Sequence, residues 1–236
     1  MTFPPRLPPY LVVALDFLDK KEALACARDL DPAFCRLKVG SSLFVGAGPG
    51  IVLALREMGF SVFLDLKFHD IPRTVASACE AAAKLGAWMV SVHAQGGQEM
   101  LLAARQALPP SVMLVAVTVL TSLDEVELGR LGVLGTPCEA VLRLAELSLE
   151  CGADGWVASA QEVGILRERF GPSPLLVIPG MREKPSSDDQ KRVGKVEEAA
   201  AGDYFVVGRP IIHAPAPGDE ARRWAARISN IAAKKG

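Results

Sequence analysis

The feature that most constrains the fold is a unit that recurs along the chain. Each unit has a short apolar run, a polar residue or glycine at its end, and usually a stretch with apolar residues at helical spacing. Eight such runs occur, at residues 10–16, 34–40, 61–67, 88–94, 112–121, 154–160, 174–180 and 204–210. Strands that alternate with helices at this spacing predict βαβ units and a parallel sheet. Their near-continuous apolar character is typical of a sheet covered on both faces.

Eight units predict an α/β fold of the (β/α)8 TIM barrel type, and 236 residues fit one such domain over residues 1–236. The same alternation allows a doubly wound open sheet, which is the alternative. Helical spacing is present at 20–30, 50–59, 74–86, 99–108, 138–152 and 160–171. The one long polar loop, at 181–192, precedes the eighth run, and loops of this length often serve as lids or binding loops.

Composition argues against several classes of protein. The chain has 26 Lys and Arg against 27 Asp and Glu, so it lacks the basic excess of a nucleic-acid binder. Its five cysteines include no C-x-x-C pair, and we expect neither a zinc site nor a disulfide framework. The first 16 residues hold several prolines and one short apolar run, unlike a signal peptide or a membrane span. We therefore expect a cytoplasmic protein that binds neither nucleic acid nor membrane.

Charged residues gather at the end of the third run, where residues 62–75 read VFLDLKFHDIPRTV. On an extended strand, Asp65 and Lys67 point to the same side, and Asp70 follows three residues later. Lys38 ends the preceding strand, so two cations and an acid should face the mouth of the barrel, where barrel enzymes keep their active sites. Such a cluster is unfavourable to bury unless it is paired and hydrogen-bonded. The other strand ends supply Asp16, His93, Thr121, Ser159, Arg182, Gly208 and Arg209.

Structural roles compete with functional ones at several of these positions. Asp65 and Lys67 suit a simple ion pair at a strand end. Asp70, Asp16 and Thr121 each suit a helix N-cap. Ser159 suits a cap so well that we leave it out of the site. The histidines His69, His93 and His213 are given no catalytic role.

The segment DLKFHDIPRT, at 65–74, is similar to the signature of the orotidine 5'-phosphate decarboxylase family. Other segments resemble family segments in the family's order: VVALD at 12–16, CRLKVG at 35–40, VHA at 92–94, VTVLTS at 117–122, SAQE at 159–162, PGMR at 179–182 and VGRPI at 207–211. The resemblance covers the full chain and is to the bacterial branch. It implies decarboxylation of orotidine 5'-phosphate to UMP and CO₂, the last step of de novo pyrimidine nucleotide synthesis, without a metal or an organic cofactor.

The resemblance also implies catalytic roles. Lys67 would stabilise the carbanion at C6 of the pyrimidine and deliver the proton that replaces CO₂. Asp65 and Asp70 would flank the departing carboxylate and hold Lys67 in place. Lys38 would complete the alternating array of charges and reach the ribose. In the family the active form is a homodimer, in which Asp70, Ile71 and Thr74 would reach into the partner's site.

The remaining substrate contacts are implied in the same way. Asp16 would bind the ribose hydroxyls, and Thr121 would contact the pyrimidine. Gly208, through its backbone N–H, and Arg209 would hold the phosphate at the start of a short helix. Arg182 and Gln190 would close the loop over the substrate. The loop departs from the family's P-G-I-R-P pattern at 181–183, so the alignment of Gln190 depends on where a gap is placed.

Two other functions compete with this interpretation. Magnesium-dependent sugar-phosphate decarboxylases or aldolases of the same superfamily also carry D-x-K-x-x-D, but they place an acidic metal ligand at the second strand end. Here Lys38 stands at that position and would repel a cation. The second is a barrel that binds a phosphorylated ligand without catalysis, and the retention of every charged position argues against it.

Overall fold

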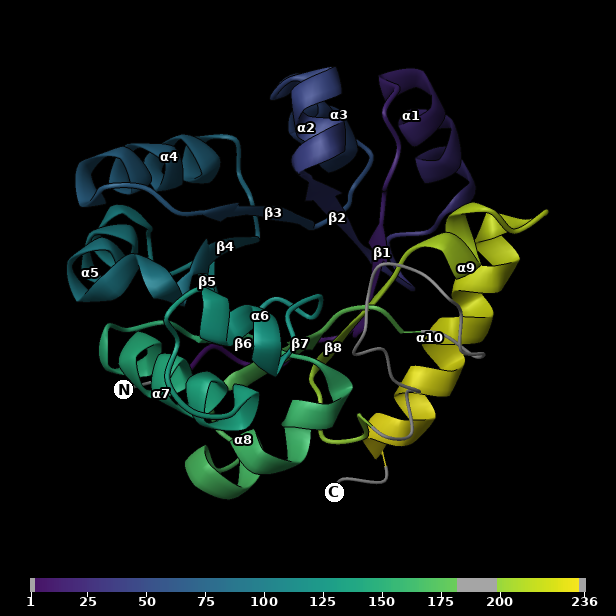
Figure 1. The fold of residues 1–236 in the computed structure, drawn as a ribbon. Helices are drawn as coiled ribbons and strands as arrows, with labels where there is room; N and C mark the ends of the chain where they lie inside the picture. Colours follow the sequence, from purple (N-terminus) through teal and green to yellow (C-terminus); the bar gives the residue numbers. More distant parts are fainter. Residues whose placement is uncertain (1–2, 182–198, 234–236) are drawn as a thin grey trace.

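The computed structural model describes residues 3–181 and 199–233, and its eight strands form one closed parallel barrel in chain order. Figure 1 shows the strands at the centre and the helices around them. The strands are β1 (Leu11–Ala14), β2 (Arg36–Gly40), β3 (Val62–Phe68), β4 (Met89–His93), β5 (Met113–Val117), β6 (Gly155–Val157), β7 (Leu175–Ile178) and β8 (Tyr204–Val207). The ring closes where β1 pairs with β8, with Val12 opposite Val206. The predicted barrel is confirmed, and the open-sheet alternative is wrong because an open sheet would leave β1 and β8 as free edges.

Helices of the outer layer form where the apolar spacing predicts them. They are α1 (Lys20–Asp29), α3 (Gly50–Glu57), α4 (Pro72–Lys84), α5 (Gly97–Ala107), α7 (Pro137–Glu150) and α8 (Val163–Phe170), with the 3₁₀ turns η1 (Ala94–Gly96) and η2 (Ala160–Glu162) before α5 and α8. The short helix expected after the last strand is α9 (Arg209–Ile212). Within the described residues, no helix is long and apolar enough to cross a membrane.

Three further helices are not predicted by the apolar spacing: α2 (Ser41–Ala47), α6 (Glu125–Arg130) and α10 (Pro217–Ala233). The first two have seven and six residues, too few for a helical period to emerge from the sequence. The buried face of α10 includes Ala221 and Ala225 beside Trp224 and Ile228. These four residues recur at helical spacing, so the signal of α10 is present in the sequence and was missed.

Packing leaves the carboxyl ends of the strands as the place for chemistry. Alternate strand side chains, among them Phe63, Met89 and Val177, fill the inside of the barrel, while the others pack beneath the helices. At the amino ends, the Arg36 guanidinium lies 4.3 Å from the centre of the Trp88 ring and donates to the backbone oxygen of Pro9. The interior is therefore a packed core, and a cavity opens only beyond its layers.

Candidate active site

A cavity of about 330 Å³ opens at the carboxyl ends of the strands. This volume is in the range of about 300–1,000 Å³ that small-molecule sites usually have. Its polar lining consists of Asp16, Lys38, Asp65, Lys67, Thr121, Ser122, Gly208 and Arg209. The cavity therefore lies where the sequence predicted it, at the carboxyl ends of the strands. Of these lining residues, only Ser122 was not among the predicted site residues.

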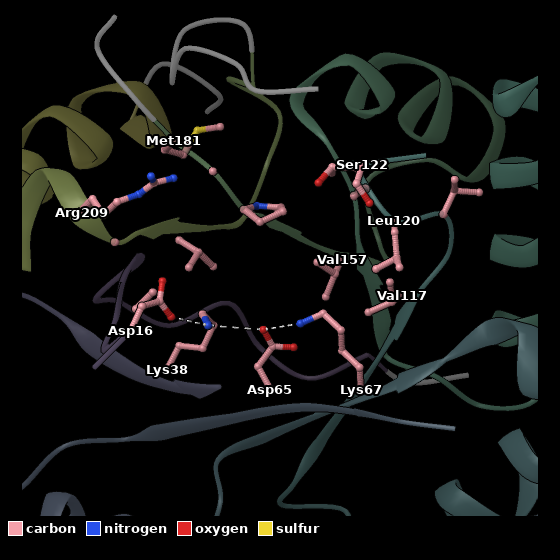
Figure 2. A pocket seen from close by; sticks show the side chains of 18 of the residues that line it. Asp16, Lys38, Asp65, Lys67, Val117, Leu120, Ser122, Val157, Met181 and Arg209 are labelled. Atoms are coloured by element: carbon pink, nitrogen blue, oxygen red, sulfur yellow. Dashed lines mark hydrogen bonds and ion pairs between the residues drawn. The ribbon is translucent and has the colours of Figure 1, made fainter. Parts of the chain in front are cut away.

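Four charged side chains of alternating sign form a continuous row along one side of the cavity (Figure 2). Lys38 Nζ lies 3.3 Å from Asp16 Oδ1 and 3.6 Å from Asp65 Oδ2. Lys67 Nζ lies 2.9 Å from the same Asp65 Oδ2. The Lys38 and Asp65 side chains are 13% and 8% exposed, whereas those of Asp16 and Lys67 are 56% and 35% exposed, so the middle of the row is buried and both of its ends are more open.

Burial and neighbouring charges shift the pKa values of Asp65 and Lys38, the inner members of the row, in opposite directions. Burial by itself raises the pKa of Asp65, because a carboxylate loses hydration there. The ammonium groups of Lys38 and Lys67, with hydrogen bonds from Lys67 and Ser91, outweigh burial and hold the pKa of Asp65 below its usual value. Burial likewise lowers the pKa of Lys38, but Asp65 and Asp16 outweigh it and raise that pKa. Both shifts favour the charged forms, so the row is stable as an ionic array.

Strand β3 is irregular where it delivers Lys67. Leu64 pairs with Val90 of β4, but the next pair is Phe68 with Val92, so two extra residues of β3 are accommodated. Lys67 has a φ of 52°, in the left-handed region that a non-glycine residue seldom adopts. Asp65 and Lys67 do meet as predicted, but the reason given from the sequence is incomplete, because a regular alternation of side chains does not extend through this bulge.

A buried serine supports the bulge from the neighbouring strand. Ser91 Oγ donates a hydrogen bond to Asp65 Oδ1 at 2.8 Å and accepts one from the backbone N–H of Lys67 at 3.0 Å. Ser91 is fully buried in β4 and does not line the cavity. Sequence reasoning missed it, although a single serine within the apolar run 88–94 was a usable signal.

The opposite end of the cavity is built by the turn from β8 into α9. Gly208 is the N-cap of α9 and Arg209 is its first residue. A β-carbon placed on Gly208 would lie 3.2 Å from Asp16 Oδ2 and 3.5 Å from Ala14 Cβ, so glycine lets this backbone approach β1 closely. In Figure 2, Arg209 lies on the side of Asp16, whereas Leu120 and Ser122 lie across the cavity from them.

Three predicted site residues are not brought into the cavity of their own chain. Asp70, Ile71 and Thr74 are exposed at the start of α4, and none of them lines the cavity. Ile71 is 66% exposed. Two other predicted residues, Arg182 and Gln190, lie outside the residues that the structure describes.

The competing capping roles are settled by the helix ends. The N-cap of α1 is Asp19, whose side chain accepts from two backbone N–H groups, so the alternative for Asp16 is wrong. The N-cap of α6 is Asp124, so the alternative for Thr121 is also wrong. Ile71, and not Asp70, is the N-cap of α4. Ser159 is the N-cap of η2, as expected.

The rest of the cavity lining is apolar. The apolar lining includes Val117, Leu120, Val157, Pro179 and Met181, which were not predicted because apolar residues carry no distinctive local signal. A flat aromatic ring fits such a lining better than a highly hydroxylated chain does.

Among the described residues, no three His, Cys, Asp or Glu side chains lie together in a way that could hold a metal ion.

Comparison with known proteins adds the following findings. A model of the family "Orotidine 5'-phosphate decarboxylase / HUMPS family" matches residues 9–224. The orotidine 5'-phosphate decarboxylase of Nitrosococcus oceani is 50% identical over 227 residues, which cover 94% of this chain and 98% of that protein. The protein of the same name from Chromobacterium violaceum is 53% identical over 213 residues, covering 88% and 86% of the two chains. The crystal structure of orotidine 5'-phosphate decarboxylase from Lactobacillus acidophilus matches with a TM-score of 0.80 at 33% identity, covering 94% of this chain and 97% of that one.

Proposed function

The chain belongs to the orotidine 5'-phosphate decarboxylase / HUMPS family, and on that premise we propose how its barrel mouth converts orotidine 5'-phosphate to UMP and CO₂. The reaction is the last step of de novo pyrimidine nucleotide synthesis. We propose that residues 1–236 act as one domain, in the cytoplasm, without a metal or an organic cofactor. The observation that carries the assignment of residues is the row Asp16–Lys38–Asp65–Lys67, which lines the cavity at the carboxyl ends of the strands.

The chemistry requires a charge to be stabilised where no electron sink exists. When the bond from C6 to the carboxylate breaks, CO₂ leaves and the electron pair stays on C6, in the plane of the ring and outside its π system. A preorganised cation is the means of stabilising such a charge. In our proposal the Lys67 ammonium lies beside C6, donates one N–H proton to it and is left as an amine that solvent reprotonates. Asp65 holds Lys67 at 2.9 Å and adds negative charge beside the departing carboxylate.

The rest of the cavity is assigned to binding. Asp16, at the exposed end of the row, and its neighbour Lys38 take the ribose hydroxyls. Arg209 and the backbone N–H of Gly208 take the phosphate, and Thr121 contacts the pyrimidine on the opposite side. Because the phosphate is remote from C6, its binding energy is available to orient the ring and to close the site. By resemblance, Arg182 and Gln190 contribute to that closure.

We further propose that the active unit is a homodimer. Asp70, Ile71 and Thr74 are exposed and absent from the cavity of their own chain, which is the arrangement expected if they complete the site of a neighbouring copy. In such a dimer, burial of the exposed Ile71 side chain in the subunit contact would add to its stability. In a two-fold dimer each site would then be composite.

A metal-dependent reaction on a sugar phosphate is the competing function within the same superfamily. It calls for an acidic ligand at the end of β2, where this chain has Lys38. Lys38 is within 3.6 Å of both Asp16 and Asp65, so it neutralises the two carboxylates nearest to that position. A cation would have to displace or approach this ammonium, which is electrostatically unfavourable.

The test is a direct assay of the purified protein with orotidine 5'-phosphate in the presence of EDTA, followed by the ultraviolet absorbance change. We expect full turnover, because no step of the proposed reaction uses a metal. Loss of turnover with EDTA, restored by magnesium, would support the metal-dependent alternative. Binding of UMP without any turnover would support a barrel that binds a phosphorylated ligand without catalysis.

Arg209→Ala is expected to act through the phosphate. A hydrogen bond to a charged group contributes about 1.5–3 kcal/mol and arginine often makes two to a phosphate, so kcat/KM should fall by at least about 10²-fold. The measurement is kcat/KM for orotidine 5'-phosphate and, in parallel, for orotidine, which lacks the phosphate. The variant and the wild type should process orotidine equally slowly. An equal loss on both substrates would place Arg209 away from the phosphate.

A further inference from the structure

We infer that Ser91 is a positioning residue, whose hydroxyl fixes the orientation of Asp65 and the backbone of Lys67 at the reacting end of the cavity. The inference rests on the proposed function and extends it to a side chain that does not line the cavity. Ser91 is fully buried in the middle of β4, between Val90 and Val92, which pair with the two ends of the bulge in β3.

The backbone of Lys67 needs support that the strand pairing does not supply. The bulge places two extra residues between the regular pairs Leu64–Val90 and Phe68–Val92. In the described chain, Lys67 is also the only non-glycine residue with a positive φ. A backbone held in this region persists only where its surroundings determine it. The Lys67 N–H donates to Ser91 Oγ at 3.0 Å, so the serine side chain takes the place of a strand partner at this point.

The same hydroxyl also divides the Asp65 carboxylate between its partners. Ser91 Oγ donates to Asp65 Oδ1 at 2.8 Å, whereas Lys67 and Lys38 both lie against Oδ2, at 2.9 Å and 3.6 Å. A serine hydroxyl has one hydrogen to donate and can accept in addition, and both capacities are used here. With Oδ1 held, the carboxylate cannot rotate away from the two ammonium groups without leaving a buried oxygen unpaired.

Loss of this hydroxyl should therefore affect the chemical step more than binding. The hydrogen bonds of Ser91 join it to Asp65 and Lys67, the pair that acts at C6, whereas we assign phosphate and ribose to Arg209 and Asp16. A displacement of about 1 Å in a reacting group can lower a rate by about 10²-fold. Lys38 and Lys67 remain to hold Asp65 in the variant, so we expect a smaller loss of at least about tenfold in kcat.

The experiment compares Ser91→Ala with a matched control, Ser148→Ala. Ser148 is also fully buried and uses its hydroxyl in the same way, donating to the Ala145 oxygen at 2.9 Å and accepting from Trp156 Nε1 at 2.9 Å, but it lies in α7 away from the cavity. Melting temperature, kcat and KM for orotidine 5'-phosphate, and the Kd of UMP are measured for both. We expect kcat of Ser91→Ala to fall at least about tenfold, while its KM and its Kd for UMP stay within about threefold of the wild type. In Ser148→Ala we expect kcat, KM and the Kd of UMP all to stay at the wild-type values.

Several outcomes would overturn the inference. A kcat of Ser91→Ala within twofold of the wild type would do so, as would an equal loss of kcat in Ser148→Ala, because the effect would then follow from lost stability alone. If Ser91→Ala does not fold, Ser91→Cys is used, since a thiol keeps the shape but hydrogen-bonds weakly. For Ser91→Cys we expect the same loss of kcat as for Ser91→Ala, with KM and the Kd of UMP again close to those of the wild type. Failure of the proposed function would be distinct, because the wild type itself would then not turn over orotidine 5'-phosphate.

Discussion

Replacing Lys67 with alanine is expected to abolish decarboxylation while leaving nucleotide binding intact. In our proposal Lys67 is the only proton donor at C6, and a general acid of this kind contributes about 10²–10⁴-fold to a rate. Arg209, which we assign to the phosphate, lies elsewhere in the cavity and is unaffected. The measurements are kcat for orotidine 5'-phosphate and the Kd of UMP by calorimetry, and only the first should change by more than about 10²-fold.

Folding of this variant is not expected to fail, because Asp65 keeps two partners. Without Lys67 Nζ, the carboxylate is still 3.6 Å from Lys38 Nζ and still accepts from Ser91. Lys84→Ala is the matched control, since Lys84 is an exposed lysine in the last turn of α4 and does not line the cavity. If Lys67→Ala keeps more than about a hundredth of the wild-type kcat while Lys84→Ala is normal, the proton donor has been assigned wrongly.

The second large effect is expected from mixing two inactive variants. Lys67→Ala and Asp70→Ala should each be nearly inactive as homodimers, the second because Asp70 is proposed to serve the partner's site. After random exchange of subunits, about half of the dimers are hybrids, and each hybrid has one site with an intact Lys67 and an intact partner Asp70. Activity should therefore recover to about a quarter of that of the wild type. The measurement is turnover before and after exchange, with exchange followed by a tag on one variant.

A matched mixture makes the result specific to the shared site. Asp65 and Lys67 contact each other within one chain at 2.9 Å, so Lys67→Ala mixed with Asp65→Asn can form no intact site in any dimer. That mixture should stay inactive under the same conditions. If complete exchange between Lys67→Ala and Asp70→Ala also restores nothing, Asp70 acts within its own chain and the composite site is wrong.

Much of the fold was predictable because its information is local. A parallel barrel repeats one unit, and each unit shows its strand by a continuous apolar run and its helix by apolar spacing. The ends of those runs then pointed to Lys38, Asp65 and Lys67 as neighbours, and the two ammonium groups lie 3.6 Å and 2.9 Å from Asp65 Oδ2. No long-range information was needed, because the carboxyl ends of the strands in a closed parallel barrel gather at one end.

Other features were beyond the sequence because they depend on which atoms meet across the barrel. Closure was predicted only from the number of units, because the pairing of β1 with β8, nearly the length of the chain away, leaves no mark on the apolar pattern of either strand. The sequence left a capping role open at Asp16 and Thr121, and only the structure excluded it, because Asp19 and Asp124, three residues further on, start the helices. A sequence shows that a cap is near but not which residue the packed helix will use.

The sequence by itself determined the order of the elements and the identity of the charged residues at the strand ends. Only the tertiary structure decided how Lys67 is presented, since its φ of 52° and the bulge in β3 exist only against Ser91 of β4. The physical reason is that the two features depend on interactions of different range along the chain. Apolar periodicity records which face each residue buries, whereas the direction of a side chain at an irregular point is set by hydrogen bonds from a strand more than twenty residues away.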